Sequence, residues 1–163
     1  MIDINRIVEF AINKGYFISD LYNAIGIQKA GFLNIRKNKS GQFRIDYFYD
    51  LCEYLGIDPR DGLEIFDSKS EVNLKKYEPE HDINVLNDRN LKIEEIIKYA
   101  HSKGIYIKDI VEYIGIEGTA FREFRKSRNE EELKKYFFDI CKYVGIPYGK
   151  AVTKYTVNKS NKK

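Results

Sequence analysis

The chain has 163 residues and a mass of 19.2 kDa, which suits one ordinary domain or two small ones. Apolar residues make up 43% and charged residues 33%, a balance that excludes a disordered chain. No apolar run approaches the roughly 18 residues of a membrane span, and the N-terminus lacks the features of a signal peptide. We therefore expect a cytoplasmic protein without membrane contact. The net charge of +3 is too small to indicate nucleic acid by itself, so its distribution matters more.

Residues 1–66 carry the pattern of four to five short helices. Apolar residues recur at helical spacing over 4–12, 19–25, 28–38 and 47–55. Glycines end three of these helices, and Asp58-Pro59 predicts the N-cap and first position of a short fifth helix. No alternating strand pattern is visible, so the predicted class is all-α. The glycines are Gly15, Gly26 and Gly56.

The same pattern occurs again 89 residues further on. The segment Gly15-Tyr16-Phe17-Ile18-Ser19-Asp20-Leu21 resembles Gly104-Ile105-Tyr106-Ile107-Lys108-Asp109-Ile110, and the match continues without a gap to Gly145-Ile146. We expect two tandem domains of four to five helices, 1–66 and 91–150, with a polar linker over 67–90 and a basic tail over 151–163. A helical turn is predicted near 72–77. A flexible linker of about 24 residues spans roughly 25–30 Å.

A helix, a turn at Gly26 and a second helix follow one another over 18–35. This segment resembles the helix-turn-helix of the Cro and lambda-repressor family, also called the XRE family, and 107–124 fits in the same way. Tyr22 and Val111 stand where that family usually has alanine at the helix crossing, so we expect a wider or repacked crossing. Ile18 and Ile107 stand where it often has a polar, phosphate-contacting residue. The matching core positions are Leu21, Ile25, Ile27, Phe32 and Ile35.

The resemblance implies that side chains early on the second helix face the DNA major groove. Gln and Asn can pair with adenine, and Lys can donate to guanine. The segment 28–44 contains five basic residues and no acidic one, whereas 1–66 contains eight basic and nine acidic residues. This contrast favours the first copy as the principal DNA reader. Its predicted base contacts are Gln28, Lys29, Ala30, Leu33 and Asn34, and its predicted phosphate contacts are Arg36, Lys37, Lys39 and Arg44.

The second copy has a different charge at the corresponding positions. The segment 117–133 contains four basic and five acidic residues, including Glu130-Glu131-Glu132. This copy is either a weaker DNA reader or a module for dimerisation or protein binding. Glu117, Gly118 and Glu123 occupy part of its predicted face. Its candidate DNA contacts are Thr119, Arg122, Arg125, Lys126 and Arg128.

No catalytic, phosphate-loop or metal motif is visible, so we expect no enzyme activity, cofactor or metal. Cys52 and Cys141 hold equivalent positions and are predicted to be small buried hydrophobic residues. The leading hypothesis is a sequence-specific transcriptional repressor that binds double-stranded DNA as a monomer or homodimer. Abundant Ile, Lys, Asn and Tyr are typical of an AT-rich genome and favour a phage or mobile element. The alternative is a protein-interaction module on the same fold: an antirepressor, an anti-CRISPR factor or an assembly adaptor.

Overall fold

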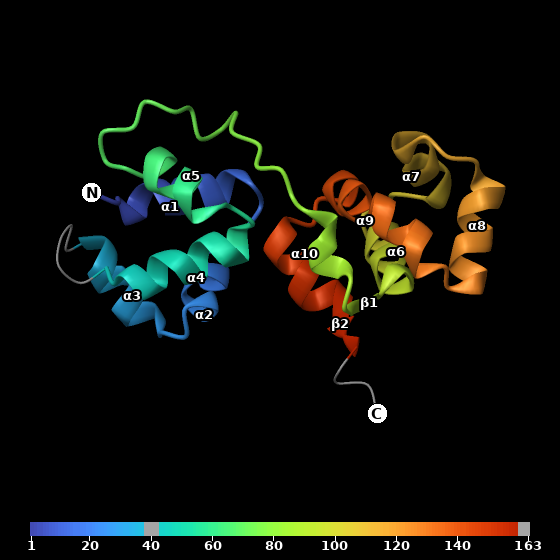
Figure 1. Ribbon diagram of the computed structural model, residues 1–163, viewed down its shortest axis with the longest axis horizontal. Coiled ribbons are helices and arrows are strands. Elements are labelled where there is room, and N and C mark those ends of the chain that lie inside the picture. The colour runs from blue at the N-terminus through green and yellow to red at the C-terminus, as the bar shows by residue number, and fades with distance from the viewer. Residues whose placement is uncertain (38–42, 160–163) are drawn as a thin grey trace. The chain divides into compact units, whose positions relative to one another are not determined.

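The computed structural model describes residues 1–37 and 43–159 (Figure 1). The chain divides into two compact units, Met1–Glu80 (unit 1) and His81–Lys163 (unit 2). Within the described ranges, almost all regular structure is helical, apart from one two-stranded sheet. The predicted all-α helix-turn-helix fold is therefore confirmed. None of the described helices is both long enough and apolar enough to cross a bilayer.

Residues 1–37 and 43–80 of unit 1 form five helices whose limits follow the apolar spacing of the sequence. Asp3 and Asp58 cap the first and last of them, because a carboxylate oxygen of each accepts the backbone N–H two residues ahead at 2.9 Å. Pro59 occupies the first position of the last helix, where a missing N–H costs nothing. The helices are α1 (Ile4–Asn13), α2 (Ile18–Ala24), α3 (Lys29–Lys37), α4 (Ile45–Leu55) and α5 (Pro59–Ile65).

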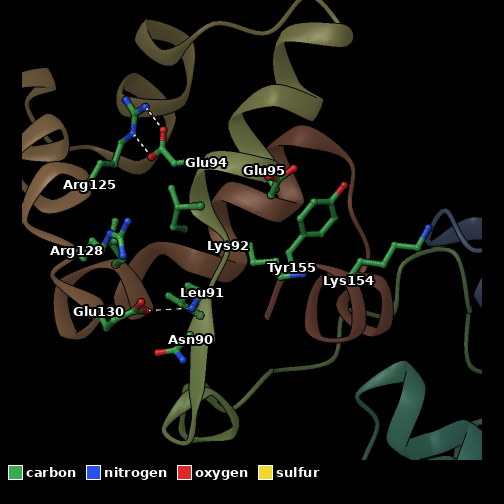
Figure 2. A pocket seen from close by; sticks show the side chains of 12 residues that line it. Asn90, Leu91, Lys92, Glu94, Glu95, Arg125, Arg128, Glu130, Lys154 and Tyr155 are labelled. Carbon is green, nitrogen blue, oxygen red and sulfur yellow. Dashed lines mark hydrogen bonds and ion pairs between the residues drawn. The ribbon is translucent and has the colours of Figure 1, made fainter. Parts of the chain in front are cut away.

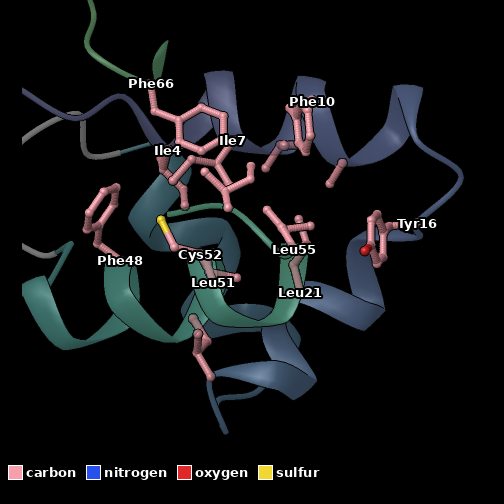
Figure 3. Packing of buried hydrophobic residues seen from close by; sticks show 14 of the residues in the cluster. Ile4, Ile7, Phe10, Tyr16, Leu21, Phe48, Leu51, Cys52, Leu55 and Phe66 are labelled. Atoms are coloured by element: carbon pink, nitrogen blue, oxygen red, sulfur yellow. The ribbon is translucent and has the colours of Figure 1, made fainter. Parts of the chain in front are cut away.

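The core of unit 1 lies between one face of α1 and the inward faces of the other helices (Figure 3). Phe10 of α1 meets Phe66, just after α5, edge to face with ring centroids 5.7 Å apart. Cys52 of α4 is fully buried, and burial raises the pKa of its thiol to about 12, so it is a packing residue rather than a reactive one. The labelled core side chains are Ile4, Ile7, Phe10, Tyr16, Leu21, Phe48, Leu51, Cys52, Leu55 and Phe66.

Unit 2 repeats these helices around its own core. Of the five α-helices over residues 81–159, four begin 89 residues after their counterparts in unit 1, and the fifth, α9, ends 89 residues after α4. Only α9 begins early, at Glu130, although the position equivalent to the first residue of α4 is Lys134. The helices are α6 (Ile93–Ser102), α7 (Ile107–Ile114), α8 (Gly118–Ser127), α9 (Glu130–Val144) and α10 (Tyr148–Tyr155).

Each unit is closed by a pairing between the residues before its first helix and those after its last. In unit 1 this is an isolated bridge between Ile2 and Asp67. In unit 2 the equivalent pair, Leu91 and Thr156, lies in an antiparallel sheet of β1 (Arg89–Leu91) and β2 (Thr156–Asn158). The 89-residue correspondence therefore extends to non-local backbone pairing.

The expected linker and tail differ from the structure. Leu74, within the predicted linker, is buried in the core of unit 1. Leu86, the last residue of a 3-10 helix (η1, Ile83–Leu86), is buried in the core of unit 2. The helical turn predicted near 72–77 is present, since Tyr77 N donates to the carbonyl of Asn73 at 3.1 Å. Residues 151–158 of the predicted tail belong to α10 and β2. Single apolar side chains attach these polar segments to the cores. The polar composition of the segments does not indicate that these side chains are buried.

Gly62 of α5 fills a position where unit 1 has no room for a methyl group. A Cβ there would lie 2.8 Å from Cys52 Sγ and 3.1 Å from Phe48 Cζ. The equivalent residue of unit 2 is Ala151, which is itself fully buried. We expect Gly62→Ala to lower the free energy of unfolding of unit 1 by about 1–3 kcal/mol through overpacking, despite the better helix propensity of alanine. Urea denaturation measures this change, and an unchanged or higher stability would contradict the packing described here.

Candidate nucleic-acid interface

The turn between α2 and α3 is built on Gly26. Its φ of +74° lies in the left-handed region that favours glycine, and Ile27 N then donates to the carbonyl of Tyr22 at 3.0 Å. At the other end of α2, the Asp20 carboxylate accepts the backbone N–H of Phe17 at 2.6 Å, which fixes the entry of the helix. Unit 2 repeats both features, with Gly115 at φ +76° and Asp109 accepting from Tyr106 N at 3.1 Å.

The helix crossing accommodates Tyr22 by repacking. This side chain is half-buried against the core, and its ring lies 6.1 Å from that of Phe32 on α3 at a tilted angle. The counterpart, Val111, is also half-buried and packs on the core of unit 2. A large side chain thus takes part in the contact between the two helices where the family usually has alanine.

The two sides of α3 differ sharply in exposure. Phe32 and Ile35 are buried and hold the helix on the core. Because residues three and four apart share a helix face, the remaining positions form a solvent-facing side. Leu33 is half-buried at its edge. The structure therefore brings together on one accessible surface the predicted base-contacting side chains Gln28, Lys29, Ala30 and Asn34 and the predicted phosphate contact Lys37.

The other predicted phosphate contacts of unit 1 have separate surroundings. Arg44 precedes α4 and is exposed; its Nε lies 3.1 Å from an Asp46 carboxylate oxygen, and its guanidinium lies 5.3 Å from the ring centre of Tyr47. Arg36 is half-buried, and its Nε donates to Asn5 Oδ1 of α1 at 2.9 Å. Lys39 lies outside the described residues. Arg36 is therefore tied to the domain, whereas Arg44 is held only at the surface.

The equivalent face of unit 2 has mixed charge. Arg125 is largely withdrawn from it, because its Nε and Nη2 donate to the two carboxylate oxygens of Glu94 at 2.9 and 2.7 Å (Figure 2). These hydrogen bonds hold the pKa of the Glu94 carboxyl below its usual value and raise that of the Arg125 guanidinium. Arg128 ends α8 in the left-handed region, at φ +52°. The exposed side chains are those of Glu117, Thr119, Arg122, Glu123, Lys126 and Arg128, and Gly118 is exposed beside them.

The early start of α9 adds negative charge next to this face. Glu130, Glu131 and Glu132 form the first turn of the helix, which Asn129 caps by accepting from Glu132 N at 3.2 Å. Carboxylates are favourable at a helix N-terminus because of the backbone dipole, so their placement stabilises α9. The same charges oppose a phosphate backbone. Unit 2 therefore lacks the acid-free surface that α3 offers in unit 1.

A pocket in unit 2 has a volume of about 620 Å³ (Figure 2). It is lined by β1, the start of α6 and the turn between α8 and α9, where Glu130 accepts the backbone N–H of Leu91 at 3.2 Å. Its lining contains both acidic and basic side chains, and Glu94 and Arg125 among them form an ion pair. The described part of the chain holds no group of three or more His, Cys, Asp or Glu suited to a metal ion. Burial also raises the pKa of the Cys141 thiol.

Sequence reasoning missed Asn5 and Glu94, the partners of the two arginines. They are equivalent positions on α1 and α6, 31 residues before Arg36 and Arg125. Asn5 and Glu94 are 89 residues apart, as are the two arginines, so the repeat shows that the positions are equivalent but not that they contact the arginines. Only the fold shows that these positions on separate helices are in contact.

A comparison with known protein families finds a match within unit 1. Residues 6–68 match the sequence model of the Cro/C1-type helix-turn-helix DNA-binding domain. No curated protein and no solved structure matches the chain. The match includes α2, the Gly26 turn and α3, so it covers the helix-turn-helix segment of unit 1. It indicates DNA binding and transcription regulation for this domain.

Proposed function

We propose that the protein binds double-stranded DNA in a sequence-specific way, with unit 1 as the principal reader. The observation that carries this proposal is the exposed side of α3, where Gln28 and Asn34 lie beside Lys29 and Lys37 without an acidic neighbour on the helix. The amide side chains have the donor and acceptor pattern to pair bidentately with adenine, and Lys29 can donate to guanine. Ala30 and Leu33 supply apolar contacts for a thymine methyl group.

The cations around this surface supply affinity rather than sequence choice. Lys37 and Arg44 are exposed, and Lys39 falls between them in the sequence. Such side chains contact phosphates, which fixes the position of the recognition helix on the duplex. In the proposed mechanism, α3 enters the major groove while Lys37 and Arg44 contact the phosphate backbone. Occupation of an operator in this way represses transcription.

The regulatory role and the origin are parts of the same proposal. A repressor of a phage or mobile element fits the Cro/C1-type domain and the composition typical of an AT-rich genome. Two readers are needed for a palindromic operator with half-sites about 34 Å apart. A homodimer would supply two copies of unit 1, and a second reader within the chain would have to be unit 2, whose face is less favourable for DNA.

A second candidate function for unit 2 is protein binding. Tyr113 of α7 and Tyr143 of α9 stack with ring centroids 4.7 Å apart, yet their exposed fractions are 48% and 36%. Exposed aromatic side chains are enriched in protein interfaces, and Glu117 and Glu123 are more compatible with a protein than with phosphate. An antirepressor, an anti-CRISPR factor or an adaptor would use this surface. Folded protein without salt-dependent DNA binding would favour this candidate.

The salt dependence of DNA affinity tests the proposed function. We expect the logarithm of the binding constant to fall linearly with the logarithm of salt concentration, by about 0.9 for each phosphate contact. Lys37→Ala/Arg44→Ala should lower this slope by up to about 1.8, because two predicted phosphate contacts are lost. Fluorescence anisotropy with a labelled duplex measures the slope. The matched control is Lys75→Ala/Lys76→Ala, which removes two exposed lysines outside α3. Equal effects of the two pairs would contradict the proposed surface.

A further inference from the structure

In each unit an arginine donates hydrogen bonds to a residue of the first helix, and we call this contact the arginine clamp. The partner of the arginine differs between the two units. In unit 1, Arg36 Nε donates to Asn5 Oδ1 at 2.9 Å, and Asn5 Nδ2 lies 3.4 Å from the Arg36 carbonyl. In unit 2, Arg125 donates to Glu94 from the equivalent positions. Both clamps join the first helix of the unit to the last turn of its recognition helix. Both units have arginine on the recognition helix, and they differ only in the residue to which it is bonded.

The partner decides how much of the guanidinium remains available. Glu94 takes both Nε and Nη2 of Arg125 and neutralises its charge, and the arginine side chain is only 20% exposed. Asn5 takes only Nε of Arg36 and carries no charge. Neither Nη atom of Arg36 has a hydrogen bond or ion pair with a residue in the described ranges 1–37 and 43–159. Arg36 thus keeps its full positive charge and has four N–H donors on its Nη atoms without a partner among the described residues.

We propose that Asn5 is a positioning residue that holds Arg36 in place so that its Nη groups bind a DNA phosphate. This inference rests on the proposed DNA-binding function of unit 1 and adds a residue of α1 to the site. Arginine loses considerable rotamer freedom when it is fixed in one geometry. The hydrogen bond from Arg36 Nε to Asn5 restricts the arginine side chain before DNA binds, so less rotamer entropy is lost on binding. The two Nη groups remain for bidentate contact with phosphate oxygens.

The same reasoning explains the asymmetry between the units. Glu94 converts the clamp into a closed ion pair, so Arg125 stabilises the contact between α6 and α8 without offering a free donor pair to phosphate. Nearby, the first turn of α9 carries three glutamates instead of the uncharged residues that precede Arg44 in unit 1. The choice between Asn5 and Glu94 therefore separates a phosphate-binding arginine from a structural one.

The test transfers the partner of unit 2 into unit 1 in the full chain. Asn5→Glu should close the ion pair with Arg36, reduce the salt slope of duplex binding by about 0.9, and weaken binding roughly tenfold at moderate salt. Its thermal midpoint should not fall, because a carboxylate in the first turn of α1 is favourable. Arg36→Ala should reduce the slope equally, and the double variant Asn5→Glu/Arg36→Ala should show no further reduction of the slope.

A matched control separates the clamp from simple repulsion of DNA. Asn13→Glu adds the same charge to an exposed position on α1, about 12 Å further along the helix. A slope reduction with Asn13→Glu as large as with Asn5→Glu would overturn the inference, as would an unchanged slope in Asn5→Glu. If the natural sequence still binds DNA in a salt-dependent way, either of these two results rejects only the role of Asn5 and not the proposed DNA binding by unit 1. If folded natural protein shows no salt-dependent binding, the proposed function itself fails.

Discussion

A chain that carries Phe32→Ala is expected to lose DNA binding, whereas a chain that carries Phe121→Ala is expected to retain it. The two phenylalanines are equivalent, fully buried residues of α3 and α8. Each fastens the recognition helix of its own unit to a separate core. The contrast follows from the assignment of DNA binding to unit 1, because neither side chain is accessible to DNA.

The expected loss of stability is large for a unit of this size. Truncating a buried phenylalanine to alanine costs about 3–5 kcal/mol, and a unit of this length has a total stability of roughly 4–12 kcal/mol. Circular dichroism on heating should therefore show an early transition for one unit and a later one for the other in each variant. DNA affinity is measured at a temperature between the two transitions. Loss of binding in Phe121→Ala with unit 1 still folded would assign DNA recognition to unit 2.

The second large effect concerns sequence choice rather than stability. Gln28→Ala/Asn34→Ala removes two exposed amides from the side of α3 that faces solvent, so the fold should persist. Each bidentate contact with a base contributes about 1–3 kcal/mol of discrimination, so the double variant should lose at least about 30-fold in affinity for its preferred duplex. Affinity for unrelated duplexes should change little, because phosphate contacts dominate it.

Competition binding with specific and unrelated duplexes at one salt concentration measures that ratio. Asn13→Ala is the matched control, since it removes an exposed amide from α1 and is expected to leave the ratio unchanged. A proportional loss of affinity for both duplexes in the double variant would instead indicate that Gln28 and Asn34 contact only the backbone.

Local sequence signals predicted most of the helices. Apolar spacing and the glycines at positions 26 and 56 gave the limits of α2 and α4 to within two residues, because a left-handed residue ends a helix wherever it lies in the fold. The 89-residue repeat carried the same limits to unit 2. Exposure along α3 also followed from helical periodicity, since Phe32 and Ile35 leave the opposite side in solvent.

The remaining features depend on contacts between distant residues. The two ends of each unit pair only when the chain has folded, as in Ile2–Asp67 and Leu91–Thr156. No alternating strand pattern in the sequence predicts these pairings. Leu74 and Leu86 anchor segments whose composition is otherwise that of a linker. The positions of Asn5 and Glu94 gave no hint that an arginine 31 residues away lies beside them. Tertiary packing determines these features.

Selection from a random double-stranded DNA pool, with the full chain and its Gln28→Ala/Asn34→Ala variant, tests most directly whether unit 1 reads DNA sequence. We predict enrichment of a defined motif by the natural sequence, and a weakened or altered motif with the variant. Two half-sites separated by about one helical turn would further indicate paired readers. No enrichment by folded protein at low salt would contradict sequence-specific DNA binding, and a protein partner would then be the first ligand to seek.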